Sequence, residues 1–215
     1  MPNILAYGDS ITWGADPARP GVRHPPAVRW PEVLAAALGG SATIITDGLR
    51  GRTTAYDEHL AECDRNGARL LPSALYAHAP LDLVILMLGT NDLKPAIAGS
   101  AIAAMQGMRR LIEITLNHSP RFAEASRPRV LVVAPPHIIP TADALYTDMF
   151  AGAAAQSQKL AALYAALAQE MGVSFFDCDP VAQASSLDGV HLDAANTAAI
   201  GAALAPIVRT LLEGA

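Results

Sequence analysis

The chain has 215 residues, which is enough for one sizeable domain whose core needs neither disulfide bonds nor a structural metal. Hydrophobic residues make up 52% and charged residues only 16%, a balance that excludes an intrinsically disordered protein. Fifteen basic and 20 acidic residues give a net charge of −5 without any Lys/Arg-rich run, so we expect no nucleic-acid partner. We therefore expect a single domain over residues 1–215, with its apolar excess buried in a sheet, in a subunit interface or in both.

The first expected element is a strand at Ile4–Tyr7, which stops at Gly8. No cationic segment precedes this run, and the run is too short for the apolar core of a signal peptide. No stretch of 18 or more strongly apolar residues follows, so the sequence predicts no membrane span. We expect a cytoplasmic protein that has no membrane partner.

Five short apolar runs recur along the chain, each four to eight residues long. Their apolar residues occupy successive rather than alternate positions, which is typical of strands covered on both faces of a parallel sheet. The five runs are Ile4–Tyr7, Thr43–Thr46, Leu81–Leu88, Val130–Ala134 and Val173–Phe176.

Longer segments with helical spacing separate these runs. Strands that alternate with helices imply right-handed crossovers, so we predict a three-layer α/β/α sandwich around a five-stranded parallel sheet. The apolar stripes of the expected helices are Trp30, Val33, Leu34 and Leu38; Ile102, Met105, Met108, Leu111, Ile112 and Ile114; Leu160, Leu163, Tyr164 and Leu167; and Ile200, Leu204, Ile207, Val208 and Leu211.

Two segments, residues 14–29 and 47–80, show no long period and contain several Pro or Gly residues. Long irregular segments in a compact domain are typically functional loops or subunit contacts, and we expect that here. The two cysteines, Cys63 and Cys178, form no disulfide framework and lack the close spacing of a zinc site, so we expect buried or idle thiols.

Polar residues follow three of the predicted strands. Ser10 comes just after the first, Asn91 follows the third, and Asp188 and His191 follow the fifth. The carboxyl ends of parallel strands are where open sheets bind ligands. An Asp three residues before a His can accept from Nδ1–H, which leaves Nε2 to take a proton from a serine hydroxyl. Each motif alone also suits a turn or helix cap, but their combination after different strands of one sheet favours nucleophilic catalysis.

Four sequence blocks occur in order along the chain: Gly8-Asp9-Ser10-Ile11, Gly48 to Thr54, Gly89-Thr90-Asn91-Asp92 and Asp188-Gly189-Val190-His191. Through them the chain resembles the SGNH, or GDSL-type, hydrolase family, with Ile11 where the family name has Leu. In detail the blocks look most like the arylesterase and acyltransferase subgroup. This resemblance covers essentially the whole chain and implies a flavodoxin-like sheet and a homo-oligomer, built from dimers and as large as an octamer.

The resemblance also implies acyl transfer through a covalent intermediate, with Ser10 as nucleophile, His191 as general base and Asp188 as the residue that orients the ring. The oxyanion hole would consist of the backbone N–H groups of Ser10 and Gly51 and the side-chain amide of Asn91. The absence of a G-x-S-x-G elbow argues against an α/β-hydrolase of the usual kind. No nucleotide-binding motif is present and the other five histidines lack metal-ligand spacing, so we expect no cofactor and no metal.

Further residues are candidates for substrate binding. Trp13 lies three residues after the nucleophile, and His137 follows the fourth predicted strand. Asp9 and Thr90 adjoin the nucleophile and Asn91, and the Tyr146–Phe150 segment could supply apolar walls. We expect the segments 14–29 and 47–80 to form a subunit interface that narrows the pocket.

The expected substrate is a small-molecule ester, with a short acetyl-type acyl group on an aryl, alkyl or carbohydrate alcohol, and transfer of that group to alcohols or peroxide is a second expected reaction. Three alternatives stay open. The chain could be a thioesterase or lysophospholipase of the same family, or a non-catalytic domain that binds acylated sugars. A phosphoacceptor domain that uses Asp9 is the third, although the acidic pair and lysine it needs are not evident.

Overall fold

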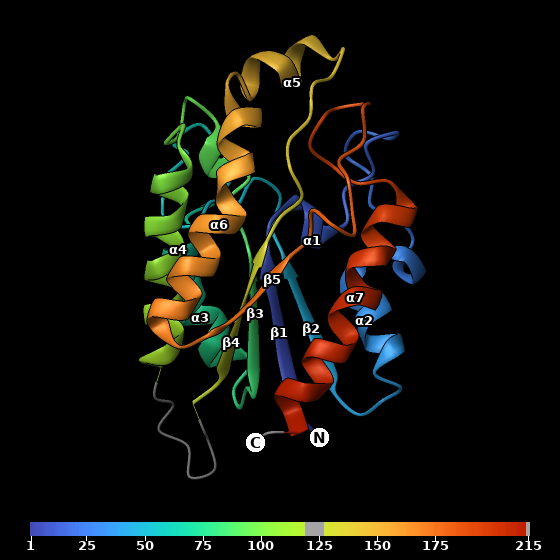
Figure 1. The fold of residues 1–215 in the computed structure, drawn as a ribbon, viewed down its shortest axis with the longest axis vertical. Helices are drawn as coiled ribbons and strands as arrows, with labels where there is room; N and C mark the ends of the chain where they lie inside the picture. The colour runs from blue at the N-terminus through green and yellow to red at the C-terminus, as the bar shows by residue number, and fades with distance from the viewer. Residues whose placement is uncertain (119–126, 214–215) are drawn as a thin grey trace.

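The central feature of the structure, a computed structural model that describes residues 1–118 and 127–213, is one sheet of five parallel strands (Figure 1). The strands lie in the order β2-β1-β3-β4-β5, as in a flavodoxin-like sheet. This confirms the predicted fold class. The strands are β1 (Asn3–Gly8), β2 (Thr43–Gly48), β3 (Leu83–Met87), β4 (Arg129–Ala134) and β5 (Ser174–Asp177).

The three inner strands are buried almost throughout, whereas β2 and β5 are only half-buried. The edge strands are nevertheless covered on both faces, as predicted, because Ile44 and Phe176 pack against one core and Ile45 and Phe175 pack against the other. Their partial exposure arises because each has a neighbouring strand on one side only. The third strand is shorter than expected, since only Leu83–Met87 of the predicted run Leu81–Leu88 is extended.

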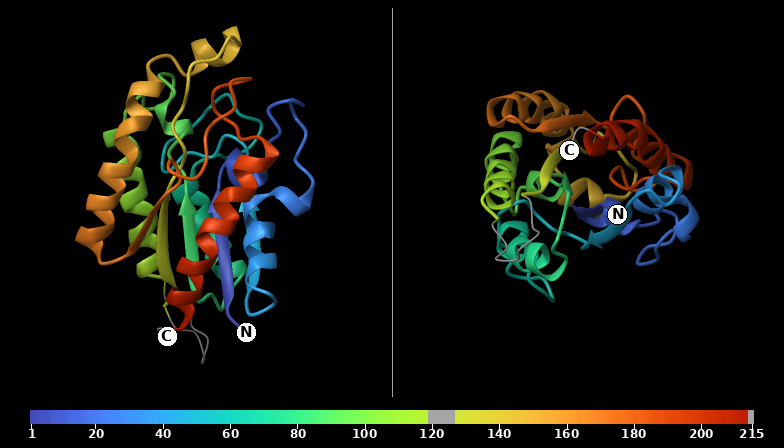
Figure 2. Two further views of the ribbon diagram at one scale, coloured as in Figure 1. Left: turned by 45° about the vertical axis from the view of Figure 1, so that its right-hand side comes forward. Right: turned by 90° about the horizontal axis from the view of Figure 1, so that it is seen from below.

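Helices cover both faces of the sheet, as the two views in Figure 2 show. One face carries α3 (Gly67–Ala77), α4 (Ala101–Leu116) and α6 (Ala153–Met171), and the other carries α2 (Trp30–Ala37) and α7 (Ala194–Glu213). Alternate strand residues supply the two cores, because successive side chains point to opposite faces. Leu5 and Tyr7 belong to the first core, and Ile4 and Ala6 belong to the second.

Among the described residues, two helices longer than a single turn lie where none was predicted. α3 occupies part of the segment 47–80, and its buried face has a single pair of leucines, Leu71 and Leu75, one turn apart, with Pro72 between them. This pattern is too short to stand out as a helical period. The short helix α5 (Ala144–Met149) has no fully buried residue and therefore no apolar stripe at all. Ile102, assigned to a buried stripe, is 51% exposed.

The last helix, α7, is long and apolar enough to cross a membrane by length and composition, in contrast to the expectation from the sequence. One or two such helices are weak evidence for a span, because core helices pass the same test. In this structure Ile200, Leu204 and Val208 are fully buried in the core of the second face, where α7 packs against α2.

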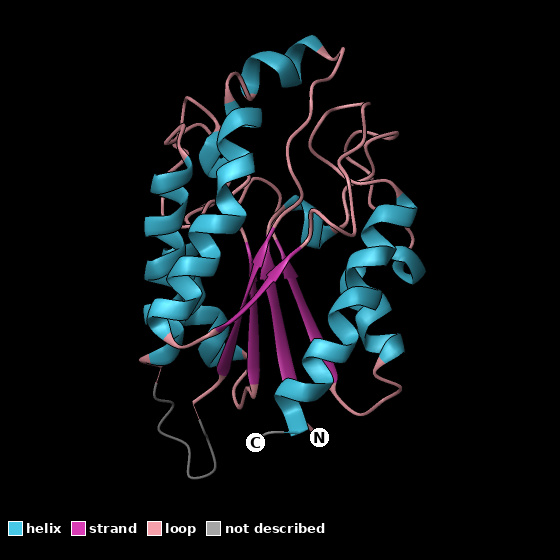
Figure 3. Ribbon diagram, in the orientation of Figure 1, coloured by secondary structure: helices cyan, strands magenta, loops and turns pink. Residues whose placement is uncertain are grey.

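The carboxyl ends of the strands meet at one edge of the sheet, where most of the long loops gather (Figure 3). The chain leaves β1 toward α2 on one face, and it leaves β3 toward α4 on the opposite face. The point between two neighbouring strands whose connections diverge in this way is the usual ligand crevice of an open α/β sheet. The fold therefore places the loops after β1 and β3 on the two sides of one crevice.

Candidate active site

Ser10 lies at the start of α1 (Ser10–Trp13), a single helical turn that begins directly after β1. The carboxylate of Asp9 caps this turn by accepting from the backbone N–H of Ile11 at 2.9 Å. The turn packs against the end of β2, where Gly48 has no side chain; a Cβ there would come within 2.3 Å of the backbone nitrogen of Trp13. The glycine thus allows the close approach that fixes Ser10 over the sheet edge.

Ser10, His191 and Asp188 form a hydrogen-bonded chain, although Ser10 lies 181 residues from His191. The Oγ of Ser10 is 2.9 Å from Nε2 of His191, and Nδ1 of the same ring is 2.7 Å from Oδ2 of Asp188. The ring of Tyr146 on α5 meets the imidazole edge-on, with 5.9 Å between centroids. These contacts hold the imidazole in an orientation that lets Nε2 accept the serine proton.

Asp188 is held in its ionised form. Its Oδ1 accepts from the backbone N–H groups of Val190 and His191 at 2.9 and 2.8 Å. Burial acts to raise the pKa of Asp188, but the hydrogen bond from His191, the charge on that ring and the two backbone donors outweigh burial and leave the pKa below its ordinary value. The carboxylate can therefore stabilise an imidazolium during catalysis.

Asn91 begins η2 (Asn91–Leu93), the short 3₁₀ turn that follows β3, and its amide lines the same cavity as Ser10. Its Nδ2 donates to the carbonyl oxygen of Arg52 at 3.1 Å and lies 3.4 Å from Oδ2 of Asp9. The Arg52 bond orients the amide, and the longer Asp9 contact leaves the second hydrogen the weaker held of the two. To serve an oxyanion, the amide has to exchange this weaker contact for one with the substrate.

Gly51 lies in the loop after β2 and lines the cavity beside Ser10. Its backbone has φ +79°, a left-handed conformation that non-glycine residues rarely adopt, and a Cβ there would come within 2.8 Å of Nη1 of Arg65. The resemblance to the hydrolase family implies that Gly51, Ser10 and Asn91 act together as oxyanion donors, and the structure brings all three to the wall of one cavity.

Arg52 is a positioning residue that the sequence analysis did not assign a role. Its guanidinium is 4% exposed and donates to the carbonyl oxygens of Gly8 and Asp47 at 2.9 and 2.7 Å. Its own carbonyl holds Asn91. Arg52 therefore links the ends of β1 and β2 to Asn91 in the turn after β3. Its place in the second sequence block is the one feature of the sequence that could have indicated this role.

Two buried carboxyl groups lie beneath the site. Burial raises the pKa of Asp9 to about 6 and the pKa of Asp92 to about 7, against the partial compensation of their hydrogen bonds. Asp92 accepts from the backbone N–H and the hydroxyl of Thr54, which fixes the far part of the loop after β2. Both carboxyl groups hold the backbone around the site in place and do not line the cavity.

The cavity in front of Ser10 has a volume of about 540 Å³. The loop after β2 provides one wall, and α5 with the residue that follows it provides another, as expected for the Tyr146–Phe150 segment. Its lining combines apolar with basic side chains. Besides Ser10, Gly51, Asn91 and His191, it consists of Leu49, Arg50, Leu60, Ala61, Glu62, Cys63, Arg65, Lys94, Tyr146, Met149, Phe150 and Val190.

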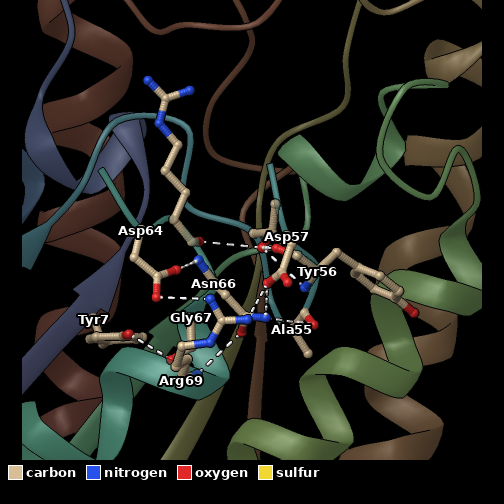
Figure 4. A network of polar contacts seen from close by, with 10 residues as sticks. Tyr7, Ala55, Tyr56, Asp57, Asp64, Asn66, Gly67 and Arg69 are labelled. Atoms are coloured by element: carbon tan, nitrogen blue, oxygen red, sulfur yellow. Dashed lines mark hydrogen bonds and ion pairs between the residues drawn. The ribbon is translucent and has the colours of Figure 1, made fainter. Parts of the chain in front are cut away.

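A polar network anchors the wall formed by the loop after β2 (Figure 4). Asn66 caps α3 by accepting from the backbone of Arg69 at 3.2 Å, and its amide donates to Ala55 O and to Asp57 Oδ1 at 3.0 and 2.7 Å. Arg69 donates to Asp57 and Asp64 at 2.6 and 3.0 Å. The helix that sequence analysis missed is thus the support on which this wall rests.

None of the four residues predicted to bind substrate lines the cavity. Trp13 is half-buried, with the guanidinium groups of Arg23 and Arg50 over its ring at 5.1 and 5.4 Å. Asp9 and Thr90 are 1% and 3% exposed and lie beneath the cavity lining. These assignments rested on nearness in sequence to Ser10 and Asn91, and at a strand end neighbouring side chains point in different directions.

The fourth of them, His137, points elsewhere and pairs with Asp179, with 2.9 Å between Nδ1 and Oδ1. The cysteines also differ from each other. Cys178 is buried, as expected, and burial raises its pKa, whereas Cys63 is exposed and lines the cavity. Within residues 1–118 and 127–213, no group of three or more His, Cys, Asp or Glu side chains is arranged to hold a metal ion.

Comparison with known proteins agrees with the esterase-like arrangement of Ser10, His191 and Asp188. A family model described as the GDSL-like Lipase/Acylhydrolase family matches residues 6–198. A carbohydrate acetylesterase family member from Sinorhizobium meliloti has a solved structure that is 50% identical, with a TM-score of 0.97 over 99% of this chain and 100% of that one. No curated protein gives a significant sequence match.

Two other solved structures extend the comparison. A second carbohydrate acetylesterase from Sinorhizobium meliloti is 39% identical, with a TM-score of 0.94 over 98% of this chain and 100% of that chain. The native aryl esterase of M. smegmatis is 40% identical, with a TM-score of 0.93 over the same shares of the two chains. The likeness therefore extends over nearly the whole length of each protein.

Proposed function

The chain belongs to the GDSL-like lipase/acylhydrolase family, and we propose that it is a serine esterase that removes short acyl groups from aryl, alkyl or carbohydrate alcohols. It is a carboxylic ester hydrolase in class. The observation that carries the proposal is the hydrogen-bonded chain Ser10–His191–Asp188, with contacts of 2.9 and 2.7 Å, at a cavity that Asn91 also lines.

In the first half of the reaction the Oγ of Ser10 attacks the ester carbonyl carbon, and Nε2 of His191 takes the hydroxyl proton. The carbonyl oxygen becomes an oxyanion, which the amide of Asn91 and the backbone N–H groups of Ser10 and Gly51 stabilise. Collapse of this intermediate breaks the bond to the alcohol, which leaves with the proton from His191. An acyl-Ser10 ester remains.

In the second half His191 activates a water molecule, which attacks the acyl carbon and passes through a second oxyanion in the same hole. Collapse releases the acid, and the proton on His191 returns to the Oγ of Ser10. Where an alcohol or peroxide occupies the place of this water, the same steps transfer the acyl group to it. Apolar side chains such as Met149 and Phe150 in the cavity wall favour such transfer, because they limit water.

Support for a short acyl group and for aryl or sugar alcohols comes from the similar proteins, which are described as carbohydrate acetylesterases and an aryl esterase. The cavity suits aryl and sugar alcohols, since the aromatic side chains of Tyr146 and Phe150 can pack against a planar ring or the face of a sugar.

The test uses purified protein with p-nitrophenyl acetate, butyrate and octanoate, beside the Ser10→Ala variant. We expect acetate to be hydrolysed with the highest kcat/KM and Ser10→Ala to lose all but a small residue of activity. A preference for octanoate would instead favour a thioesterase or lysophospholipase. If no ester gives Ser10-dependent release while circular dichroism shows folded protein, the esterase function is wrong.

We further propose that two copies of the chain associate beside this cavity. Leu60, in the loop after β2, is 99% exposed although it lines the cavity, and Leu145 on α5 is 66% exposed. Exposed large apolar side chains at a site rim are typical of a contact surface. Sedimentation of wild-type protein should give a dimer or larger assembly that Leu60→Glu weakens. A wild-type monomer at micromolar concentration would contradict this.

A further inference from the structure

Lys94 follows η2, three residues after Asn91, and its side chain lines the active-site cavity. The residue is 9% exposed. Within the described residues its ammonium group has neither a hydrogen bond nor an ion pair, and its one specific contact is the ring of Phe150, with 5.4 Å from Nζ to the ring centroid. A largely buried lysine whose ammonium group has no counter-ion is costly, so its place in an active-site wall requires an explanation.

The acidic groups nearby do not neutralise Lys94 by contact. Glu58 acts on it at longer range and is itself bound to Arg65 at 2.6 Å. Asp9 and Asp92 also act at longer range, but both are buried carboxyl groups that burial pushes toward the neutral form. The net result of burial and these charges is a pKa of Lys94 below its ordinary value.

The cavity as a whole is basic, although the protein has a net charge of −5. Arg50, Arg65 and Lys94 line it, against a single acidic side chain, Glu62. Glu58 pairs with Arg65, so the basic excess comes from Arg50 and Lys94. A cavity lined mostly by one sign of charge attracts ligands of the opposite sign. An oxygen anion would supply Lys94 with the partner that the chain does not.

We propose that this cavity accepts an ester that carries a carboxylate group and that Lys94 binds this carboxylate. The inference rests on the proposed esterase function and narrows its substrate class. Asn91 is the first residue of the short turn η2 and Lys94 follows its last, so the turn fixes the spacing between the two residues. An ester whose carbonyl oxygen lies at the amide of Asn91 can thus present a second, charged group to Lys94.

A competing role for Lys94 is to balance the buried carboxyl groups of Asp9 and Asp92 without touching substrate. The two roles differ in what they predict. A residue that binds a substrate carboxylate discriminates charged from neutral esters, mainly through KM. A residue that balances buried charge affects both kinds of ester equally, because both are hydrolysed by the same catalytic residues.

The experiment compares kcat/KM for matched esters. For a carboxylate on the alcohol side the pair is 4-acetoxybenzoate and its neutral methyl ester, and for a carboxylate on the acyl side the pair is phenyl hemisuccinate and phenyl butyrate. The variants are Lys94→Met, which removes the charge at similar length, and Lys94→Arg, which keeps it. Lys159→Met is the matched control, because Lys159 is an exposed lysine on α6 and its loss changes the net charge equally.

In one of the two pairs we expect Lys94→Met to lower the charged-to-neutral ratio by about 10–100-fold, as for loss of a hydrogen bond to a charged group, chiefly through KM. Lys94→Arg should recover part of the ratio and Lys159→Met should leave it unchanged. The pair that responds identifies the side of the ester that carries the carboxylate. Melting of Lys94→Met at or above the wild-type temperature shows that the variant is folded.

An unchanged ratio in both pairs overturns the proposal, and so does an equal loss on charged and neutral esters, which assigns Lys94 to the balance of buried charge. Failure of the esterase function itself looks different. In that case the wild-type protein hydrolyses neither member of either pair in a Ser10-dependent way.

Discussion

Replacement of Asn91 by alanine tests the oxyanion hole directly. Asn91 is 5% exposed and lines the cavity with Ser10, and its side-chain amide is oriented by a 3.1 Å bond to the carbonyl of Arg52. Alanine removes the donor without adding any group that could take its place. The variant therefore removes one oxyanion contact and leaves Ser10, His191 and their hydrogen bond intact.

The two consequences of Asn91→Ala have separate magnitudes. Loss of one preorganised oxyanion donor costs roughly 2.7–4 kcal/mol in the transition state, so kcat should fall by about 10²–10³-fold. In the ground state the carbonyl of Arg52 loses its partner, which costs about 1–3 kcal/mol of stability. For a chain of this size that corresponds to a drop in Tm of about 2–12 °C, so the protein stays folded at 25 °C.

The assay is p-nitrophenyl acetate hydrolysis at saturating substrate, with Tm measured on the same samples. Thr197→Val is a matched control, because the Thr197 hydroxyl accepts from the buried backbone N–H of Trp30 at 3.2 Å on the far side of the sheet. This variant should lose comparable stability at unchanged kcat. Wild-type turnover by Asn91→Ala would refute its role in the oxyanion hole, and an equal loss in Thr197→Val would show that lower stability explains the effect.

Three further predictions follow from the same geometry. Asp188→Asn should lower kcat by about 10⁴-fold at an unchanged fold, because the ring of His191 loses the acceptor that orients it; kcat within tenfold of wild type would be inconsistent with this. Gly51→Ala should lower kcat by about 10²–10³-fold and Tm by about 2–8 °C, because alanine is strained at φ +79°. Kinetics and thermal melts of one preparation measure both effects. Burial raises the pKa of Asp92 to about 7 from its ordinary 3.8, so the folded state binds the proton more tightly than the unfolded state. The protonated carboxyl group therefore stabilises the folded state fully below about pH 4, and this contribution is lost as the pH rises through 7. Tm should therefore fall less steeply between pH 5 and 8 in Asp92→Asn than in wild type, and parallel profiles would contradict this.

Much of the fold could be predicted from the sequence because its signals are local. Each inner strand is an uninterrupted apolar run, and helices such as α4 and α6 have long apolar stripes. The sheet edges and the helix α3 could not be recognised in the same way. The exposure of β2 and β5 depends on strand order, and α3 is fixed by distant partners such as the hydroxyl of Tyr7, which donates to Gly67 O at 2.8 Å.

The reacting groups of the site could be found for a related reason. Ser10 lies two residues after the last residue of β1, and Asn91 lies four after the end of β3, so the strand ends fix their places. The walls of the cavity have no such link to the sheet. Leu60 lines the same cavity as Ser10 only through a loop path that nonlocal hydrogen bonds set, and no sequence spacing reports those bonds.

The place of Asp9 shows how these two kinds of information combine. The sequence predicted a substrate contact, but Asp9 instead accepts from Ile11 N–H at 2.9 Å and lies 3.4 Å from the amide of Asn91. β1 and β3 pair within the sheet, but the connections that follow them diverge to opposite faces, so Ser10 and Asn91 lie on separate short turns beyond the paired strands. Arg52 joins them by donating to the carbonyl of Gly8 while its own carbonyl accepts from Asn91. Catalysis by preorganised donors requires that these two turns do not separate, so hydrogen bonds across the crevice have to provide the rigidity that the diverging connections cannot.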